Sequence, residues 1–248
     1  MTTCPDHFKR IHLAACDSTN DYLKRNLARL EADFPLMVSA AVQSAGRGRE
    51  DREWISSSDL GIYATFGFHL PDKRHLSLLS ITSGIAAIDM LHSWTGKVFA
   101  LKWPNDILAE GKKIAGIICE TIIHGDKIIC LVGIGININQ RPDDFPPELR
   151  ERAGSLRLLA DKKWPVAEGR ERLAASMTYW LKKLMQDRGS RIVRRARQLS
   201  RSFLGQTISF HHQGQVIVGI FLDIAPDGGL LLGFPGGEKK IFYSGELA

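Results

Sequence analysis

The sequence predicts an α+β protein in which one large domain of helices and strands is followed by a small all-β domain. Before residue 203, segments with apolar residues at helical spacing alternate with short runs of strand-forming residues. After residue 203, short apolar runs are separated by glycine turns, which is typical of a small β-barrel. We therefore expect domains at 1–202 and 203–248, and the second is so short that it should pack on the first to be stable.

The first half of the chain begins with a predicted helix. The polar run at 18–21 is a good N-cap, and apolar residues recur behind it at helical spacing as far as Phe34. Strands are expected at 35–43 and 60–68, with a polar loop rich in glycine and arginine between them. A buried helix is expected over 75–94, because its apolar residues also follow a helical period.

Residues 97–139 are predicted to be mainly β-structure that ends in a long hairpin. This hairpin turns at Gly125-Asp126, where glycine at the first turn position favours a type II′ connection. The resulting register pairs Thr121 with Cys130 and makes Cys119 a diagonal neighbour of Cys130 on the same face. Both cysteines are therefore expected to be buried, reduced sheet residues.

Length and composition fit an ordinary soluble globular protein. The chain has 248 residues, of which 44% are hydrophobic and 24% charged. No apolar run approaches the roughly 20 residues that cross a bilayer, and the N-terminus lacks the pattern of a secretory signal, so we expect a cytoplasmic protein without membrane contact. The four cysteines form no CxxC and no cluster with zinc-ligand spacing, so neither a metal site nor a disulfide framework is expected.

The formal net charge is +6, and the basic residues are unevenly placed. Helices are expected over 165–186 and 189–203, and the stretch 182–201 holds eight Lys and Arg residues with Asp187 as its only acid. This pattern suits the solvated face of a helix. It also suits a docking surface for an acidic partner or a nucleic acid, so both interpretations stay open.

The first candidate binding segment is Gly46-Arg47-Gly48-Arg49, with Gln43 before it and Arg52 and Trp54 after it. Glycine lets the backbone approach a ligand closely, and guanidinium groups at positions i and i+2 suit a phosphate or a carboxylate. A solvated flexible loop has the same composition, so this segment alone does not decide between the two.

Two further segments lie where strands are expected. The run Lys102-Trp103-Pro104-Asn105-Asp106 ends a strand, so the sheet can aim Lys102 into a cleft while Trp-Pro stiffens the exit. The run 133–139, GIGININ, places glycines inside a strand, which allows a helix or a ligand to approach closely. In the ligand interpretation Asn137 hydrogen-bonds a polar edge of the ligand.

Several common catalytic motifs are absent from the sequence. It contains no GxxxxGK[ST] loop, no strand–GxGxxG–helix unit and no GxSxG elbow. The chemistry is therefore expected to rest on cations and backbone groups around an anionic ligand.

Taken in this order, these segments resemble the biotin–protein ligase family. The matching segments are STN at 18–20, QSAGRGR at 43–49, Trp54, IYAT at 62–65, KWPND at 102–106, KKIAGIICE at 112–120, GIGININ at 133–139, GLLL ending at 232 and GEL at 245–247. The resemblance covers nearly the whole chain. It implies a mixed sheet flanked by helices, like that of class II aminoacyl-tRNA synthetases, followed by a small SH3-like barrel.

The resemblance also implies a site. Biotin would be bound by Ser18, Thr19, Asn20, Gln43, Gly46, Arg47, Gly48, Arg49, Tyr63, Lys102 and Gly116. The nucleotide would be bound by Arg49, Arg52, Trp54, Asn105 and Asn137, and no residues for a protein-bound metal are implied. Lys102, Arg47 and Arg49 are the implied catalytic residues, because they would neutralise the repulsion between the biotin carboxylate and the α-phosphate of ATP.

The implied activity is ATP-dependent formation of biotinyl-5′-AMP, followed by transfer of biotin to a lysine of a biotin carboxyl carrier protein. ATP and biotin are the implied substrates, Mg²⁺ accompanies ATP, and a homodimer is compatible with the family. Only 17 residues precede STN, so a DNA-binding helix-turn-helix module and specific DNA binding are not expected. A lipoate or octanoate ligase on the same scaffold, or a non-catalytic biotin sensor or nucleic-acid binder, are the alternatives.

One segment departs from the family pattern. The family loop usually continues with glycine and basic residues, whereas Glu50-Asp51 stands here before Arg52. Two acids beside a phosphate-binding loop should weaken anion binding unless they point outward. We therefore expect retention of the adenylate to depend on where these two side chains lie.

Overall fold

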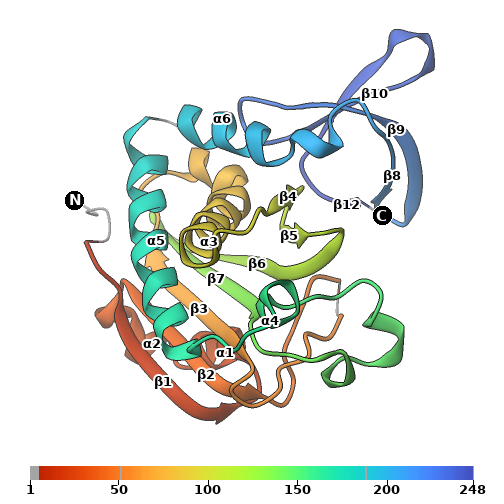
Figure 1. Ribbon diagram of the computed structural model, residues 1–248. Helices are drawn as coiled ribbons and strands as arrows, with labels where there is room; N and C mark the ends of the chain where they lie inside the picture. Colours follow the sequence, from red (N-terminus) through yellow and green to blue (C-terminus); the bar gives the residue numbers. More distant parts are fainter. Residues whose placement is uncertain (1–5, 51, 188, 248) are drawn as a thin grey trace.

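A seven-stranded mixed sheet forms the centre of the protein in the computed structural model, which describes residues 6–50, 52–187 and 189–247 (Figure 1). The strand order is β1-β2-β3-β7-β6-β5-β4. The strands are β1 Lys9–Cys16, β2 Leu36–Gln43, β3 Gly61–His69, β4 Ala100–Lys102, β5 Asp106–Ala109, β6 Lys112–His124 and β7 Lys127–Asn137. β1 and β2 are parallel and the other neighbours are antiparallel, so the expected mixed sheet is confirmed.

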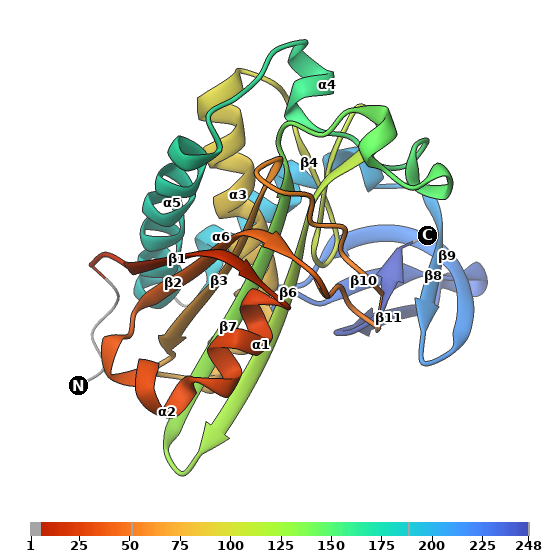
Figure 2. The ribbon, with the colours of Figure 1, turned by 90° about the horizontal axis from the view of Figure 1, so that it is seen from below.

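Helices cover both faces of this sheet, because its central strands are apolar on both sides. The helices are α1 Thr19–Arg25, α2 Leu27–Leu30, α3 Leu79–Thr95, α4 Leu156–Ala160, α5 Val166–Gln186 and α6 Ser190–Leu199. Along β7, Cys130 and Val132 join the larger core with α3 and α5, whereas the alternating Ile129 and Leu131 join a smaller core beneath α1. Figure 2 shows α1 and α2 well separated from α3 and α5.

The helix α3 is the centre of the larger core. Together with the 3₁₀ turn before it, the segment Lys73–Thr95 is by length and composition apolar enough to cross a membrane. The expectation that no segment approaches such a length is therefore wrong. However, 67% of the most apolar 18-residue stretch of this segment is buried inside the protein. In addition, α3 packs on α5, α6 and β6 as a core helix does.

The C-terminal residues form a separate antiparallel sheet of five strands in the order β11-β10-β9-β8-β12. These are β8 Thr207–His212, β9 Gln215–Ile224, β10 Leu230–Gly233, β11 Lys239–Phe242 and β12 Glu246–Leu247. No pairing between the outer strands β11 and β12 is present in the described residues, so the expected barrel is an open sheet by its hydrogen bonds.

This small sheet packs on the first domain, as its size requires. Its buried residues Phe210, Phe221 and Leu232 belong to the same core as α3 and α5. Polar contacts add to the packing: Trp103 Nε1 donates to the Gly228 carbonyl at 2.9 Å, and Arg197 pairs with Asp223 at 2.8 Å.

Two local predictions are corrected. The helix expected up to Phe34 ends at Arg25 and resumes as α2, because the Asn26 side chain donates to the Tyr22 carbonyl and the chain turns there. The predicted pairing of Thr121 with Cys130 is confirmed. However, only Cys130 is buried, because Cys119 lies on β6 beyond the end of its pairing with β5 and is exposed.

The burial of α3 predicts a large stability cost for a cavity in it. Leu91 is fully buried in the larger core, so Leu91→Ala should lower the free energy of unfolding by about 2–5 kcal/mol. Val98→Ala is the matched control, since Val98 is 83% exposed and should change stability little. Urea denaturation measures both, and equal effects of the two substitutions would contradict the assignment of α3 as the core helix.

Candidate active site

A pocket of about 420 Å³ lies along β6 and β7 beneath the loop that joins β2 to β3. Its volume is in the range of sites that bind small molecules. The structure brings fourteen of the predicted site residues to its wall: Ser18, Thr19, Asn20, Gln43, Arg47, Gly48, Arg49, Arg52, Trp54, Tyr63, Lys102, Asn105, Gly116 and Asn137. Gly46 is not among the lining residues. It supports the loop instead, since a Cβ there would lie 2.4 Å from the Trp54 carbonyl oxygen.

One end of the pocket is a buried polar network at the start of α1. The Thr19 backbone N–H and hydroxyl both donate to Gln43 Oε1, at 2.8 and 3.0 Å, and Gln43 Nε2 donates to Ser56. Thr65 links Thr19 to Asn20 Oδ1. The Nδ2 donor of Asn20 is buried and has no acceptor among the described residues. A buried donor without a partner is costly, so this amide is available for a ligand acceptor.

The floor of the pocket is made of glycines on β6 and β7. A Cβ at Gly133 would lie 2.7 Å from Asn20 Oδ1, and one at Gly135 would lie 2.4 Å from the Trp54 ring. Gly116 also faces Trp54, at 3.0 Å. These glycines allow α1 and the Trp54 indole to reach the strands closely, so the predicted close approach is present at this floor.

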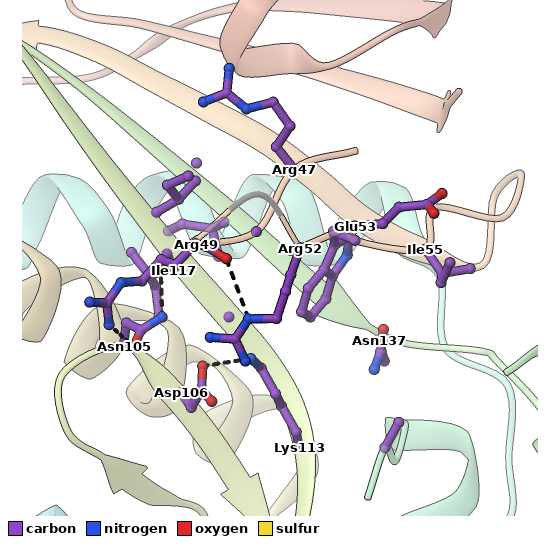
Figure 3. Close-up of a pocket in the computed structure, with 18 of the residues that line it drawn as sticks. Arg47, Arg49, Arg52, Glu53, Ile55, Asn105, Asp106, Lys113, Ile117 and Asn137 are labelled. Atoms are coloured by element: carbon purple, nitrogen blue, oxygen red, sulfur yellow. Dashed lines mark hydrogen bonds and ion pairs between the residues drawn. The ribbon is translucent and has the colours of Figure 1, made fainter. Parts of the chain in front are cut away.

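Cations gather at the other end of the pocket (Figure 3). Lys113 Nζ lies 2.7 Å from Asp106 Oδ1 and 5.7 Å from the centroid of the Trp54 ring. Arg49 Nη1 donates to Asn105 Oδ1 and to the Gly245 carbonyl, both at 3.0 Å. Each cation is thus held by oxygen atoms on separate elements of the fold, which fixes its position before a ligand arrives.

Lys102 also lines this end of the pocket and is half-buried. Burial lowers the pKa of its ammonium group, while the nearby carboxylates of Asp106 and Glu246 act in the opposite direction. An anionic ligand would oppose the effect of burial in the same way. The site is therefore built for a negative charge.

Arg47 lines the pocket but its guanidinium is engaged elsewhere. Figure 3 shows it directed away from the cluster around Lys113 and Arg52. Its two terminal nitrogens pair with Asp21 at 2.5 Å and Glu120 at 2.8 Å, on α1 and β6. In this arrangement Arg47 anchors the front of the loop to the sheet.

The C-terminal domain completes the site. Glu246 on β12 forms a two-pronged ion pair with Arg52 of the loop. The hydrogen bond from Arg52 is the main cause that lowers the pKa of Glu246. Since the Gly245 carbonyl also accepts from Arg49, two arginines of the loop are held by β12 and the residue before it.

Five charged lining residues were not assigned from the sequence: Glu53, Asp106, Lys113, Arg152 and Glu246. The run KKIAG gave a signal for Lys113, but a lysine before a strand does not show which way it points. A register shift in the pairing of β5 with β6 lies next to Lys113, and such a bulge re-aims a side chain.

Glu50, the first of the two acids after Arg49, falls outside the centre of the site. Glu50 lies 3.5 Å from Arg52 and its side chain is 59% exposed, so it points outward. Asp51 lies outside the described residues.

The basic stretch on α5 and α6 is partly used within the fold. Arg195 pairs with Asp89 at 2.6 Å, and Arg197 pairs with Asp223. Lys182 pairs with Asp6, and Arg191 with Asp187. Arg188 lies outside the described residues. These pairs engage four of the eight basic residues of the stretch within the fold.

Comparison with known families agrees with this geometry. Residues 13–139 match the model of the biotin/lipoate A/B protein ligase family, and residues 203–247 match that of the biotin protein ligase C-terminal domain. The chain belongs to the biotin/lipoate A/B protein ligase family. The first match includes the lining residues from Ser18 to Asn137, and the second includes Glu246 and Leu247.

Individual members of this family are similar over different lengths. The biotin–[acetyl-CoA-carboxylase] ligase of Mycobacterium tuberculosis is 30% identical over 95% of this chain and 86% of its own length. The bifunctional ligase/repressor BirA of Bacillus subtilis is 36% identical over 59% of this chain, and the match spans 46% of that protein. A biotin protein ligase from Aquifex aeolicus, solved with biotin and ATP, has a TM-score of 0.82 and 30% identity, with 97% of both chains covered.

The contact between the loop and the last strand predicts a measurable change in loop order. Glu246→Gln removes the charge that holds Arg52, so the loop at 47–52 should open more often. Because the pair is partly exposed, we expect a loss of about 1 kcal/mol, or about fivefold faster trypsin cleavage in this loop. Glu238→Gln, which breaks an exposed pair with Lys240, is the control. Equal cleavage rates for both variants would contradict a role of Glu246 in loop order.

Proposed function

We propose that this protein is an ATP-dependent biotin–protein ligase that forms biotinyl-5′-AMP and transfers biotin to a lysine of a carrier protein. The proposal rests on the difference in charge between the two ends of the pocket. One end is a buried polar network with a free amide donor, and the other is a cluster of cations. A neutral ring joined to an anionic adenylate has this same division of charge. Family membership supports biotin as the ring.

The polar end suits the ureido ring of biotin. Asn20 Nδ2 would donate to the ureido oxygen, and the Gln43 and Thr19 side chains would pair with the remaining edge. Ser18 and Tyr63 would close this end of the pocket around the ring and its tail. These roles would satisfy the donor that has no acceptor among the described residues.

The cationic end suits adenylate formation. The biotin carboxylate would attack the α-phosphate of ATP, the new oxygen–phosphorus bond would form, and pyrophosphate would leave. Both reactants are anions, so their approach requires fixed positive charge. Lys102, Lys113 and Arg49 line this end of the pocket and would neutralise this charge, and Arg52 would face the phosphates. Arg47, placed among the catalytic residues by its motif, would act in this conformation by holding the loop.

The nucleotide would lie over the glycine floor beside Trp54 and Asn137. Mg²⁺ would arrive with ATP and be held mainly by the phosphates, because Asp106 and Glu246 in the pocket wall already pair with Lys113 and Arg52. Mg²⁺ would supply further neutralisation of the phosphates. The carrier would be a biotin carboxyl carrier protein, in keeping with relatives named biotin–[acetyl-CoA-carboxylase] ligase.

The first prediction from this proposal concerns the two lysines. Lys113→Ala and Lys102→Ala should each lower the rate of biotin-dependent pyrophosphate release by on the order of 10²–10³, since each removes a cation aimed at developing charge. Lys112→Ala is the matched control, because Lys112 is the neighbour of Lys113 in sequence but its ammonium contacts the Arg150 carbonyl. A wild-type rate in the Lys113 or Lys102 variant would remove that lysine from the mechanism.

A second prediction separates biotin from lipoate, which the family also includes by name. Isothermal titration should detect binding of biotin and little binding of lipoate, because lipoate has no ureido group to accept from Asn20. Asn20→Ala should weaken biotin binding by on the order of tenfold, the effect of losing one buried hydrogen bond. Tight lipoate binding without biotin binding would favour the lipoate ligase alternative.

A further inference from the structure

The basic stretch at 182–201 is not used by the proposed active site, because none of its described residues lines the active pocket. The stretch covers the end of α5, the helix α6 and the turn after it. Figure 1 shows α6 at the outside of the molecule, between α5 and the C-terminal domain. The surface that this stretch forms is therefore separate from the ligand site.

The helix α6 has an apolar side and a basic side. The apolar side is buried in the larger core and consists of Ile192, Val193 and Ala196. The exposed residues follow one another at spacings of three and four, which places them together on the opposite side of the helix. They are Arg191, Arg194 and Gln198, and Arg201 continues the row in the turn after α6.

Two further arginines lie between these sides and attach α6 to the fold. Arg195 pairs with Asp89 of α3 at 2.6 Å. Arg197 pairs with Asp223 of β9 at 2.8 Å and also donates to the Ile224 carbonyl. The packing of the protein therefore accounts for both of these arginines.

The outer cations are held much less firmly. Arg191 pairs with Asp187 at 3.5 Å, and its side chain is 45% exposed. Arg194 and Arg201 are exposed, and neither side chain forms an ion pair or a hydrogen bond with a described residue. Like charges on one face repel each other unless an anion lies among them. This outer side of α6 is therefore a surface of positive charge that an anionic partner would stabilise.

We propose that the outer side of α6 binds the phosphate backbone of a duplex nucleic acid without reading its sequence. A guanidinium group donates two hydrogen bonds to one phosphate, so arginines suit this partner. The helix is about 15 Å long, and its cations would face about four base-pair steps of a duplex. Contacts to phosphates position a protein on the duplex but carry no sequence information.

Other anionic partners fit this surface less well. A protein interface has apolar or aromatic side chains at its centre, and a single nucleic-acid strand is bound by aromatic stacking. The exposed residues of α6 include no apolar or aromatic side chain. A helix that lies on a membrane inserts its apolar side, whereas the apolar side of α6 is already buried. A duplex is the partner that requires only regularly placed charge.

The number of outer arginines sets the expected salt dependence. If Arg191, Arg194 and Arg201 each neutralise one phosphate, the logarithm of the association constant should fall with the logarithm of salt concentration with a slope of about −3. The dissociation constant should be on the order of 10⁻⁵ M at low salt. Duplexes of different sequence should bind equally well.

The test measures fluorescence anisotropy of a short labelled DNA duplex of random sequence over a range of salt concentrations. Arg194→Ala and Arg201→Ala should each weaken binding about tenfold at low salt and reduce the slope by about 1. Arg29→Ala is the matched control, because Arg29 is an exposed arginine of α2 beside the smaller core, and it should bind as wild type does.

Two further measurements separate loss of binding from loss of structure. Neither outer arginine has a side-chain partner among the described residues, so both variants should unfold at the same temperature as wild type. Biotin-dependent pyrophosphate release should also stay unchanged in both, because neither residue lines the active pocket.

Three results would overturn the proposal. The first is that wild type does not bind the duplex, and the second is that both alanine variants bind it as wild type does. The third is that polyglutamate or phosphatidylserine vesicles bind as tightly as the duplex at equal concentration of anionic groups and with the same dependence on Arg194. That result would assign the surface to an acidic protein or a membrane. None of these results bears on the ligase function, which pyrophosphate release tests separately.

Discussion

The site depends on holding several cations close together in one pocket. Like charges repel one another, and partial burial adds a desolvation cost, so each cation needs a fixed partner. Lys113 is held by Asp106, Arg52 by Glu246, and Arg49 by two neutral oxygens. These partners come from two parts of the chain far apart in sequence, 105–106 and 245–246, so the pocket exists only when both domains have assembled.

Because the cations need these partners, the C-terminal domain has a structural role in the site. The small sheet shares the larger core with α3 and α5, and this packing sets the position of β12 against the loop. The loop thus has one end tied by Arg47 to α1 and β6 and the other tied by Arg52 to β12. A loop held at both ends loses less entropy when it orders over a ligand, which favours binding.

The glycine floor and the polar network form the uncharged end of the pocket, where a ligand could lie close to the backbone. Side chains on Gly133 or Gly135 would collide with Asn20 or Trp54. The same glycines leave room for α1 and Trp54 to pack on the sheet and also line the pocket. The Asn20 amide stays free of acceptors among the described residues because its carbonyl side is the part used by Thr65.

The sequence by itself determined the mixed helix-and-strand class, the small β-domain and fourteen residues of the pocket wall. Periodicity and turn residues are local signals, and the motifs marked the loop, the KWPND turn and the glycine strand directly. Only the tertiary structure decided which cations face the pocket. Arg47 turned to Asp21 and Glu120, while Lys113 and Glu246 entered the site through a strand bulge and a domain contact. Such directions depend on partners distant in sequence, which no local pattern records.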